Sequence, residues 1–141
     1  MQTTKYAFKT TVKLSYEEAI QRVTDELKKE GFGILTEIDV RETLKKKLNV
    51  DFRKYKILGA CNPPNAYKVL QAESDIGLLL PCNVIVYEIE GGSTVVAAID
   101  PVAAMSPVEN IGLEATAQDI RRKLQAVIAS METEDLTGSS S

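Results

Sequence analysis

Two apolar segments, 84–89 and 94–99, lie close together in the chain and are separated only by Glu90-Gly91-Gly92-Ser93. Both segments are rich in valine and isoleucine, which favour β-strands. A four-residue connection is too short for a crossover between parallel strands, so these two strands must pair in antiparallel fashion. The adjacent glycines suit a hairpin turn, and they lack the spacing and the lysine of a phosphate-binding loop. The sequence therefore predicts an antiparallel hairpin within a sheet.

Four other segments have the pattern of strands. Alternation of polar and apolar residues predicts strands over 4–12, 33–40 and, more weakly, 52–60. The continuous apolar run Ile76-Gly77-Leu78-Leu79-Leu80 predicts a strand that is buried on both faces. Pro81 cannot donate a hydrogen bond to a neighbouring strand, so the chain should break or bulge there.

Capping signals and apolar spacing predict the helices. Ser15 with Glu18 forms a capping box at the start of a long helix, which Gly31 is suited to end. A second apolar stripe predicts a final helix over 112–131. Its spacing is close to a heptad repeat, so the stripe fits packing on the chain's own sheet or, as the alternative, pairing with another subunit. Shorter helices are expected over 41–48 and from Pro63 to Ala72.

These elements together define the expected architecture. We predict an α+β fold, a two-layer sandwich of a mainly antiparallel sheet with two long helices on one face. Residues 1–131 should form a single domain, and residues 132–141 a flexible polar C-terminal tail. Residues 101–111 are expected to form a loop.

The composition restricts the chemistry and the setting. The chain has no histidine, which removes the usual general base, the commonest zinc ligand and every Ser-His or Cys-His nucleophile. A formal net charge of −3 gives no general attraction to nucleic acid or to an anionic membrane. No apolar stretch is long enough to span a bilayer, and the first residues lack the apolar core of a secretion signal. We therefore expect a cytoplasmic protein.

The two cysteines lie in the most unusual segments. Cys61-Asn62-Pro63 and Pro81-Cys82-Asn83 each place a thiol beside an amide and a proline at a strand irregularity. Such irregularities often direct side chains into clefts. If Asn62 caps a helix, the positive helix end lies close to Cys61 and favours its thiolate. Both sulfurs are then expected to face one pocket.

Three readings of these segments remain open. Cysteines often serve as small buried apolar residues, and the asparagines and prolines are then only caps and kinks. Alternatively, the segments form a pocket for a small ligand or anion. In the third reading the thiols carry redox or metal chemistry, although a metal would need two further ligands.

Two other segments also have more than one interpretation. The basic cluster Lys45-Lys46-Lys47, Arg53, Lys54 and Lys56 includes Phe52 and Tyr55, and its residue types match a phosphate or nucleic-acid patch. We favour the simpler interpretation that it is a solvated face of a helix and an edge strand. The segment after Asp100-Pro101 fits either a lid over a neighbouring pocket or a connection at a dimer interface.

The Cys-Asn segments also carry a family resemblance. Ile57 to Pro63, the run from Ile76 to Tyr87, and Ile99-Asp100-Pro101 with Met105 together resemble the domain of unknown function 302 family over roughly residues 5–130. The resemblance implies a compact α+β fold assembled as a homodimer, and it implies no established reaction. It directs attention to five candidate site residues, which are Cys61, Asn62, Cys82, Asn83 and Asp100.

Our functional prediction is a dimeric small-ligand-binding or regulatory module, with a pocket near Cys61, Cys82 and Asp100. The alternative is a thiol-dependent redox or sulfur-handling protein that uses the two cysteines. A third possibility is a purely structural interaction domain. We predict neither a nucleic-acid partner nor a membrane partner, and we assign no catalytic residue, metal ligand or cofactor.

Overall fold

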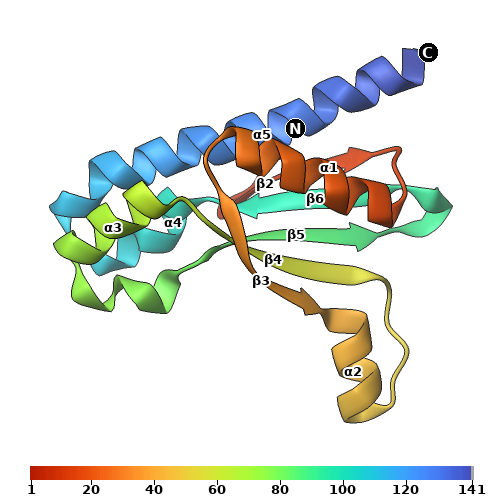
Figure 1. The fold of residues 1–141 in the computed structure, drawn as a ribbon, viewed down its shortest axis with the longest axis horizontal. Helices are drawn as coiled ribbons and strands as arrows, with labels where there is room; N and C mark the ends of the chain where they lie inside the picture. The colour runs from red at the N-terminus through yellow and green to blue at the C-terminus, as the bar shows by residue number, and fades with distance from the viewer. Residues whose placement is uncertain (141) are drawn as a thin grey trace.

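Figure 1 shows the computed structural model, which describes the backbone of residues 1–140 and the side chains of residues 1–132. Six strands form one sheet in the order β1-β2-β6-β5-β4-β3, and every neighbouring pair is antiparallel. The strands are β1 (Gln2–Thr3), β2 (Ala7–Val12), β3 (Gly33–Asp39), β4 (Tyr55–Cys61), β5 (Cys82–Glu88) and β6 (Thr94–Ile99).

The predicted hairpin is formed by β5 and β6. Its turn contains Gly91 and Gly92, whose φ angles of 87° and 80° are in the left-handed region that glycine adopts without strain.

Two long helices, α1 (Tyr16–Lys29) and α5 (Glu114–Ser140), cover one face of this sheet (Figure 1). The predicted α+β sandwich is thereby confirmed. The shorter helices are α2 (Val40–Leu48), α3 (Pro63–Ala72) and α4 (Pro101–Met105), and short 3₁₀ segments include η1 (Ser74–Leu79). Within the described residues, no helix combines the length and the apolar character needed to cross a membrane.

The capping box at the start of α1 is present as predicted. The Ser15 hydroxyl accepts from the Glu18 backbone N–H at 3.1 Å, and the Glu18 carboxylate accepts from the Ser15 backbone N–H at 3.0 Å. Gly31 follows the helix with a φ of 86°. These local contacts fix both ends of α1, and its apolar stripe, which includes Val23 and Leu27, faces the sheet.

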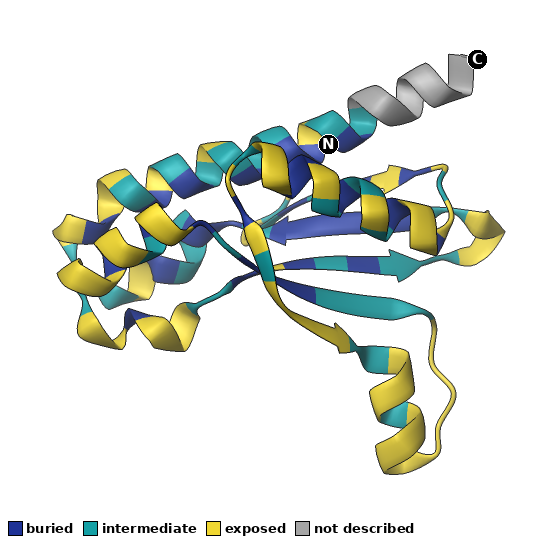
Figure 2. Ribbon diagram, viewed as in Figure 1, coloured by how far each residue is buried: buried dark blue, intermediate teal, exposed yellow. Residues whose placement is uncertain are grey.

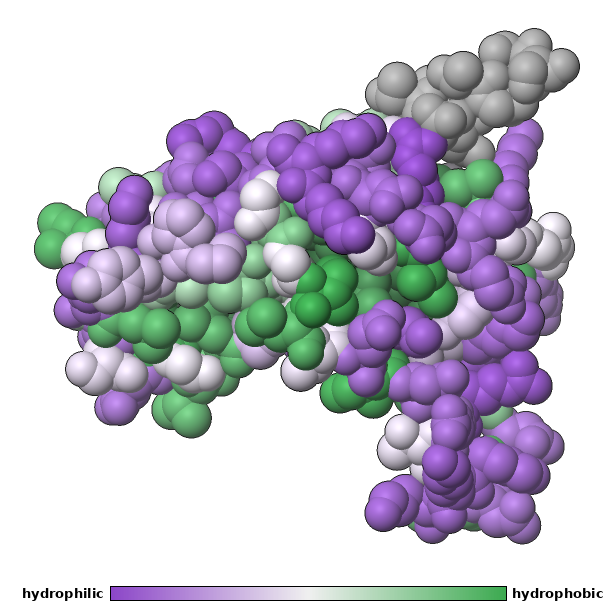
Figure 3. Space-filling view, viewed as in Figure 1, coloured by the Kyte–Doolittle hydropathy of each residue, from purple (hydrophilic) through white to green (hydrophobic). Residues whose placement is uncertain are grey.

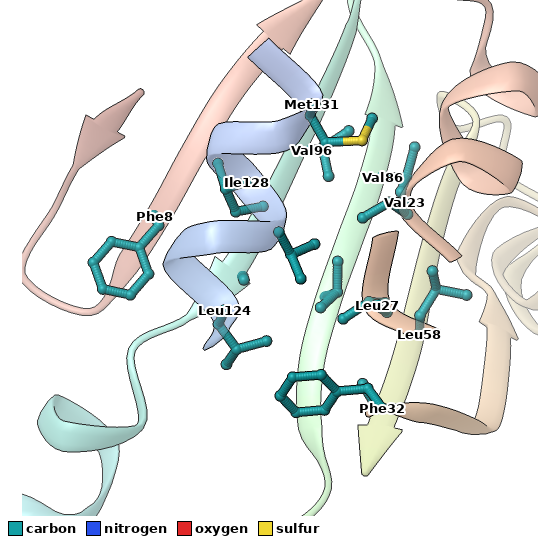
Figure 4. Packing of buried hydrophobic residues seen from close by; sticks show 14 of the residues in the cluster. Phe8, Val23, Leu27, Phe32, Leu58, Val86, Val96, Leu124, Ile128 and Met131 are labelled. Carbon is teal, nitrogen blue, oxygen red and sulfur yellow. The ribbon is translucent and has the colours of Figure 1, made fainter. Parts of the chain in front are cut away.

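The main core lies between the sheet and the two long helices. Every second residue is buried from Phe8 to Val12 of β2 and from Cys82 to Val86 of β5 (Figure 2), and Figure 4 shows apolar side chains packed between the strands and the long helices. The largest of these side chains come from β2, β4, β5, β6, α1 and α5; they include Phe8, Leu27, Leu58, Val86, Val96, Leu124, Ile128 and Met131. The stripe of α5 packs on β2, β6 and α1, so the interpretation as a core helix holds.

The other face of the sheet, which we call the open face, is covered by neither long helix. Ile38, Ile57 and Ile85 form a cross-strand row on this face, and Ile38 is 47% exposed. Tyr55 and Tyr87 stack beside the row with ring centroids 5.2 Å apart. The open face is thus apolar as well as accessible.

The predicted strand over Ile76–Leu80 is wrong. These residues belong largely to η1, in which Ile76 is buried while Leu78 is 88% exposed. The pairing of β4 with β5 reaches only to Cys82, so the residues before Pro81 have no partner strand. An apolar run without a partner strand bends into a helical turn here.

The loop prediction for 101–111 is also wrong, because the segment contains α4 and a further 3₁₀ turn. Asp100 caps α4 and Pro101 takes its first position, which is the same arrangement that Asn62 and Pro63 give α3. Leu70 of α3 is 43% exposed. The flexible tail predicted over 132–141 falls mostly on residues whose side chains lie outside the described residues, and it stays a prediction.

Candidate functional site

The two Cys-Asn segments meet where β4 ends and β5 begins. Ala60 is the cross-strand partner of Cys82, so Cys61 and Cys82 lie at the same edge of the sheet. Gly59 permits a close approach at this point, because a β-carbon there would collide with the Thr36 hydroxyl and would lie 2.8 Å from the Pro81 ring. Strand pairing therefore brings together two segments that are distant in the sequence.

A cavity of about 320 Å³, which we call the thiol cavity, opens beside this edge. Residues of β3, β4, α3, α5 and the segment before β5 contribute to its wall. Apart from the two cysteines and Asn62, the wall is formed by apolar residues and a glycine: Phe32, Leu35, Ala60, Ala66, Leu70, Gly77, Leu80, Pro81 and Ile120. The cavity is thus lined almost wholly by carbon and sulfur.

Both cysteines are free, and both line the thiol cavity. Cys82 is buried, whereas Cys61 is half-buried. Burial raises the pKa of the Cys82 thiol to about 11, and the neighbouring Cys61 adds to this effect. Cys82 therefore stays protonated at neutral pH, and it contributes a neutral sulfur to the wall.

Asn62 lines the same cavity, but its amide is already bonded within the protein. Its side-chain oxygen accepts from the Asn65 backbone N–H at 3.3 Å and so caps α3. Its side-chain nitrogen donates to the Glu30 carbonyl at 3.2 Å, just after α1. Asn62 thereby joins α1 to α3 and fixes one wall of the cavity.

Asn83 and Asp100 occupy different positions. Asn83 is exposed and lines a second cavity of about 260 Å³, which shares Leu80, Pro81 and Cys82 with the thiol cavity. Asp100 lines neither cavity. Its carboxylate accepts from the Val102 backbone N–H at 3.0 Å and pairs with Arg121 at 3.3 Å. Of the five candidate residues, the structure therefore places Cys61, Asn62 and Cys82 together.

Sequence reasoning missed most of the apolar wall. Phe32, Leu35, Ala66, Leu70 and Ile120 carry no motif, and they come from elements that are far apart in the chain. Leu35 is nevertheless 65% exposed, which is unusual for a leucine in a strand and marks the rim of the cavity. Figure 3 shows that apolar side chains gather over α3 and η1 and extend toward β3.

A buried polar contact between α3 and α5 was also missed. Asn65 is buried, and its side-chain nitrogen donates to the Asp119 carboxylate at 3.0 Å. Hydrogen bonds from Lys123 and from Asn65 lower the pKa of Asp119. No sequence signal identifies a contact across so many residues, yet it holds α3 against the helix that supplies Ile120.

The basic cluster lies on α2 and around the start of β4, at the other end of the sheet. Several of its lysines pair with carboxylates: Lys46 with Glu42 at 2.7 Å, and Lys54 with Glu17 at 3.1 Å. Among residues 1–132, no group of three or more histidine, cysteine or acidic side chains is arranged to hold a metal ion.

The fold and the cavity define a two-layer α+β protein with a thiol-containing apolar cavity at one end of an antiparallel sheet. The family model for the domain of unknown function DUF302 matches residues 8–131, and the chain belongs to this family. A crystal structure of an uncharacterised conserved DUF302 protein from Bacillus stearothermophilus superposes with a TM-score of 0.82. The two sequences are 32% identical, and the match covers 89% of this chain and 98% of the other. No curated protein matches the sequence.

Proposed function

We propose that this protein is a homodimeric module that binds a small molecule in the thiol cavity, in a ligand-storing or regulatory role. The observation that carries the proposal is the convergence of the two Cys-Asn segments on one apolar cavity. Its volume of about 320 Å³ lies at the lower end of the range of small-ligand pockets, roughly 300 to 1,000 Å³. The proposal places the protein in a reducing cytoplasm, where two free cysteines persist as thiols.

The chemistry of the wall favours binding over catalysis. General acid–base catalysis needs an ionisable group whose pKa lies near the working pH. The pKa of Cys82 is moved in the opposite direction, to about 11, and Asn62 already uses both ends of its amide. The wall thus supplies shape and apolar contact rather than proton transfer.

A second candidate function is thiol chemistry, which the presence of two free cysteines in the lining of one cavity favours. In this role the half-buried Cys61 would act first, because Cys82 is buried and its raised pKa disfavours the reactive thiolate. Replacement of both cysteines by alanine separates the two functions. A binding module keeps its ligand affinity in the double variant, whereas a thiol protein loses its activity.

The test of ligand binding uses the neutral dye N-phenyl-1-naphthylamine, which fluoresces in apolar surroundings. We expect saturable binding to the wild-type protein. Ala66→Phe fills the cavity and should weaken binding at least about tenfold, the equivalent of about 1.4 kcal/mol. The matched control is Ala72→Phe, an exposed position on the same helix. Equal binding by both variants, or no saturable binding, would contradict the proposal.

The homodimer is proposed to form through the open face. The sheet is about 25 Å wide and about 20 Å long, a footprint of roughly 500 Å² from strand spacing and rise. A standard interface needs about 800 Å² per partner. Helix α2 and the residues that follow it extend beyond the sheet (Figures 1 and 2). Three apolar residues of this segment, Leu48, Val50 and Phe52, are exposed. We propose that a second copy covers both surfaces, because together they offer a larger area than the sheet alone.

A further inference from the structure

The interior of the thiol cavity offers little to a charged or strongly polar group. Among the described residues that line it none is charged, and the amide of Asn62 is already bonded to Glu30 and Asn65. A charged or polar group placed in such surroundings without a partner loses its hydration with no compensation. The part of a ligand inside the cavity must therefore be uncharged and apolar.

The shape of the wall favours a flexible chain over a flat ring. Among the described residues that line the cavity, Phe32 alone is aromatic, so they provide no pair of aromatic rings to enclose a planar ligand. Branched aliphatic side chains, such as Leu80 and Ile120, form much of the wall. These side chains give close van der Waals contact to a methylene chain of similar width.

The rim of the cavity is apolar as well. Leu35 and Leu70 belong to the wall, yet they are 65% and 43% exposed. Leu78 and Leu79 of the neighbouring η1 are 88% and 40% exposed. Exposed apolar side chains grouped in this way mark a binding surface for an apolar partner. A ligand that fills the cavity can thus extend over the rim without meeting a charged group of the wall.

We infer that the thiol cavity takes a single saturated aliphatic chain, whose uncharged tail lies against Ile120 and whose polar end stays at the Leu35–Leu70 rim. This inference rests on the proposed function and adds the class of the ligand. The two cysteines serve as small, polarisable wall residues in this arrangement, a role that suits a neutral buried sulfur.

The test is the displacement of N-phenyl-1-naphthylamine by a series of linear 1-alkanols from butanol to dodecanol. Each added methylene should tighten binding about fourfold, which corresponds to about 0.8 kcal/mol of apolar transfer, until the chain reaches the rim. Benzyl alcohol should displace the dye more weakly than 1-heptanol, which has the same number of carbons. Linear alkylammonium ions with the same chain lengths as the alkanols test whether the charged end stays in solvent. We expect their affinity to rise with chain length as the affinity of the alkanols does.

Ala66→Leu provides the structural control, because it removes space from the cavity on α3. The affinity should stop rising at a shorter chain in this variant, whereas Ala72→Leu should keep the wild-type profile. Thermal unfolding checks that both variants are folded. Dye binding without any dependence on chain length, or stronger displacement by benzyl alcohol, would overturn the aliphatic-chain inference and leave the proposed cavity in place. Absence of saturable dye binding would instead overturn the proposed function itself.

Discussion

Asn62 and Asp100 each stabilise two parts of the fold with one short polar side chain. Each precedes a proline and caps a helix, and each also bonds to a second element, Asn62 to the Glu30 carbonyl and Asp100 to Arg121. Sequence reasoning selected both as site residues. In the structure both side chains make contacts that stabilise the fold. Of the two, Asn62 also lines the thiol cavity.

Asn62→Ala should lower the free energy of unfolding by about 2 kcal/mol, because a helix cap and a buried hydrogen bond are lost together. Asn62→Asp retains an acceptor for the cap but sets a buried carboxylate against the Glu30 carbonyl, so it should cost at least as much as the alanine variant. Urea unfolding measures both. Asn83→Ala, at an exposed position, is the control and should change stability by less than about 0.5 kcal/mol. Equal stability of Asn62→Ala and the wild type would contradict the assigned contacts.

The Cys82 thiol should make the protein less stable at high pH. Its pKa is about 11 in the folded protein against an ordinary value of 9.0, so folding favours the protonated form. The stabilisation is complete below about pH 9 and is lost as the pH rises toward 11, by at most about 2 to 3 kcal/mol. Urea unfolding between pH 8 and pH 11 should show this decline.

Cys82→Ala is the control for that measurement, since it removes the thiol. Tyr16 also has a raised pKa, about 12, and will contribute a decline of its own in the same direction. The difference between the wild type and Cys82→Ala isolates the cysteine. If the two proteins lose stability in parallel across this range, Cys82 does not have the raised pKa described here.

At the scale of the elements, local signals predicted most of the fold. Caps at Ser15 and Asn62 correctly placed the starts of two helices, because a cap is decided by neighbouring residues. The run Ile76–Leu80 was misread because an apolar run without periodicity does not distinguish a buried strand from a helical turn. The partner strand decides between them, and that information lies elsewhere in the chain.

Substitution of Gly59 tests whether β3, β4 and Pro81 approach one another closely. Gly59→Ala places a β-carbon against the Thr36 hydroxyl and the Pro81 ring, so it should cost about 1 to 3 kcal/mol of stability. The double variant Thr36→Ala, Gly59→Ala should regain part of this loss, because one of the two collisions is removed. Chemical denaturation measures both effects. Gly33→Ala is the control, since a β-carbon there meets no atom within 4 Å.

At the scale of the whole molecule, strand pairing explains why the site was only partly predictable. The position of each cysteine at a strand irregularity indicated a shared cavity, and the pairing of Ala60 with Cys82 brings the segments together. The wall residues Phe32, Leu70 and Ile120 could not be predicted, because their contact depends on how α3 and α5 pack at the end of the sheet. Long-range packing leaves no local pattern in the sequence.

The proposed dimer is tested on the open face. Ile85→Glu places a charge in the Ile38–Ile57–Ile85 row and should convert the dimer to a monomer, because a buried charge without a partner is costly. Light scattering after size-exclusion chromatography measures the mass. Ile111→Glu, at a position that is 84% exposed and lies outside the sheet, should leave the mass unchanged. A monomeric wild-type protein would contradict the dimer.

Methyl NMR tests directly whether a small apolar ligand occupies the thiol cavity. The protein is labelled at its leucine and isoleucine methyl groups and titrated with 1-decanol. We predict saturable shifts of the methyl signals of Leu35, Leu70, Leu80 and Ile120, which line the cavity. The methyl signals of Leu48 and Ile111, which are exposed elsewhere, should not move. Shifts confined to other residues, or no saturable shift at all, would contradict it.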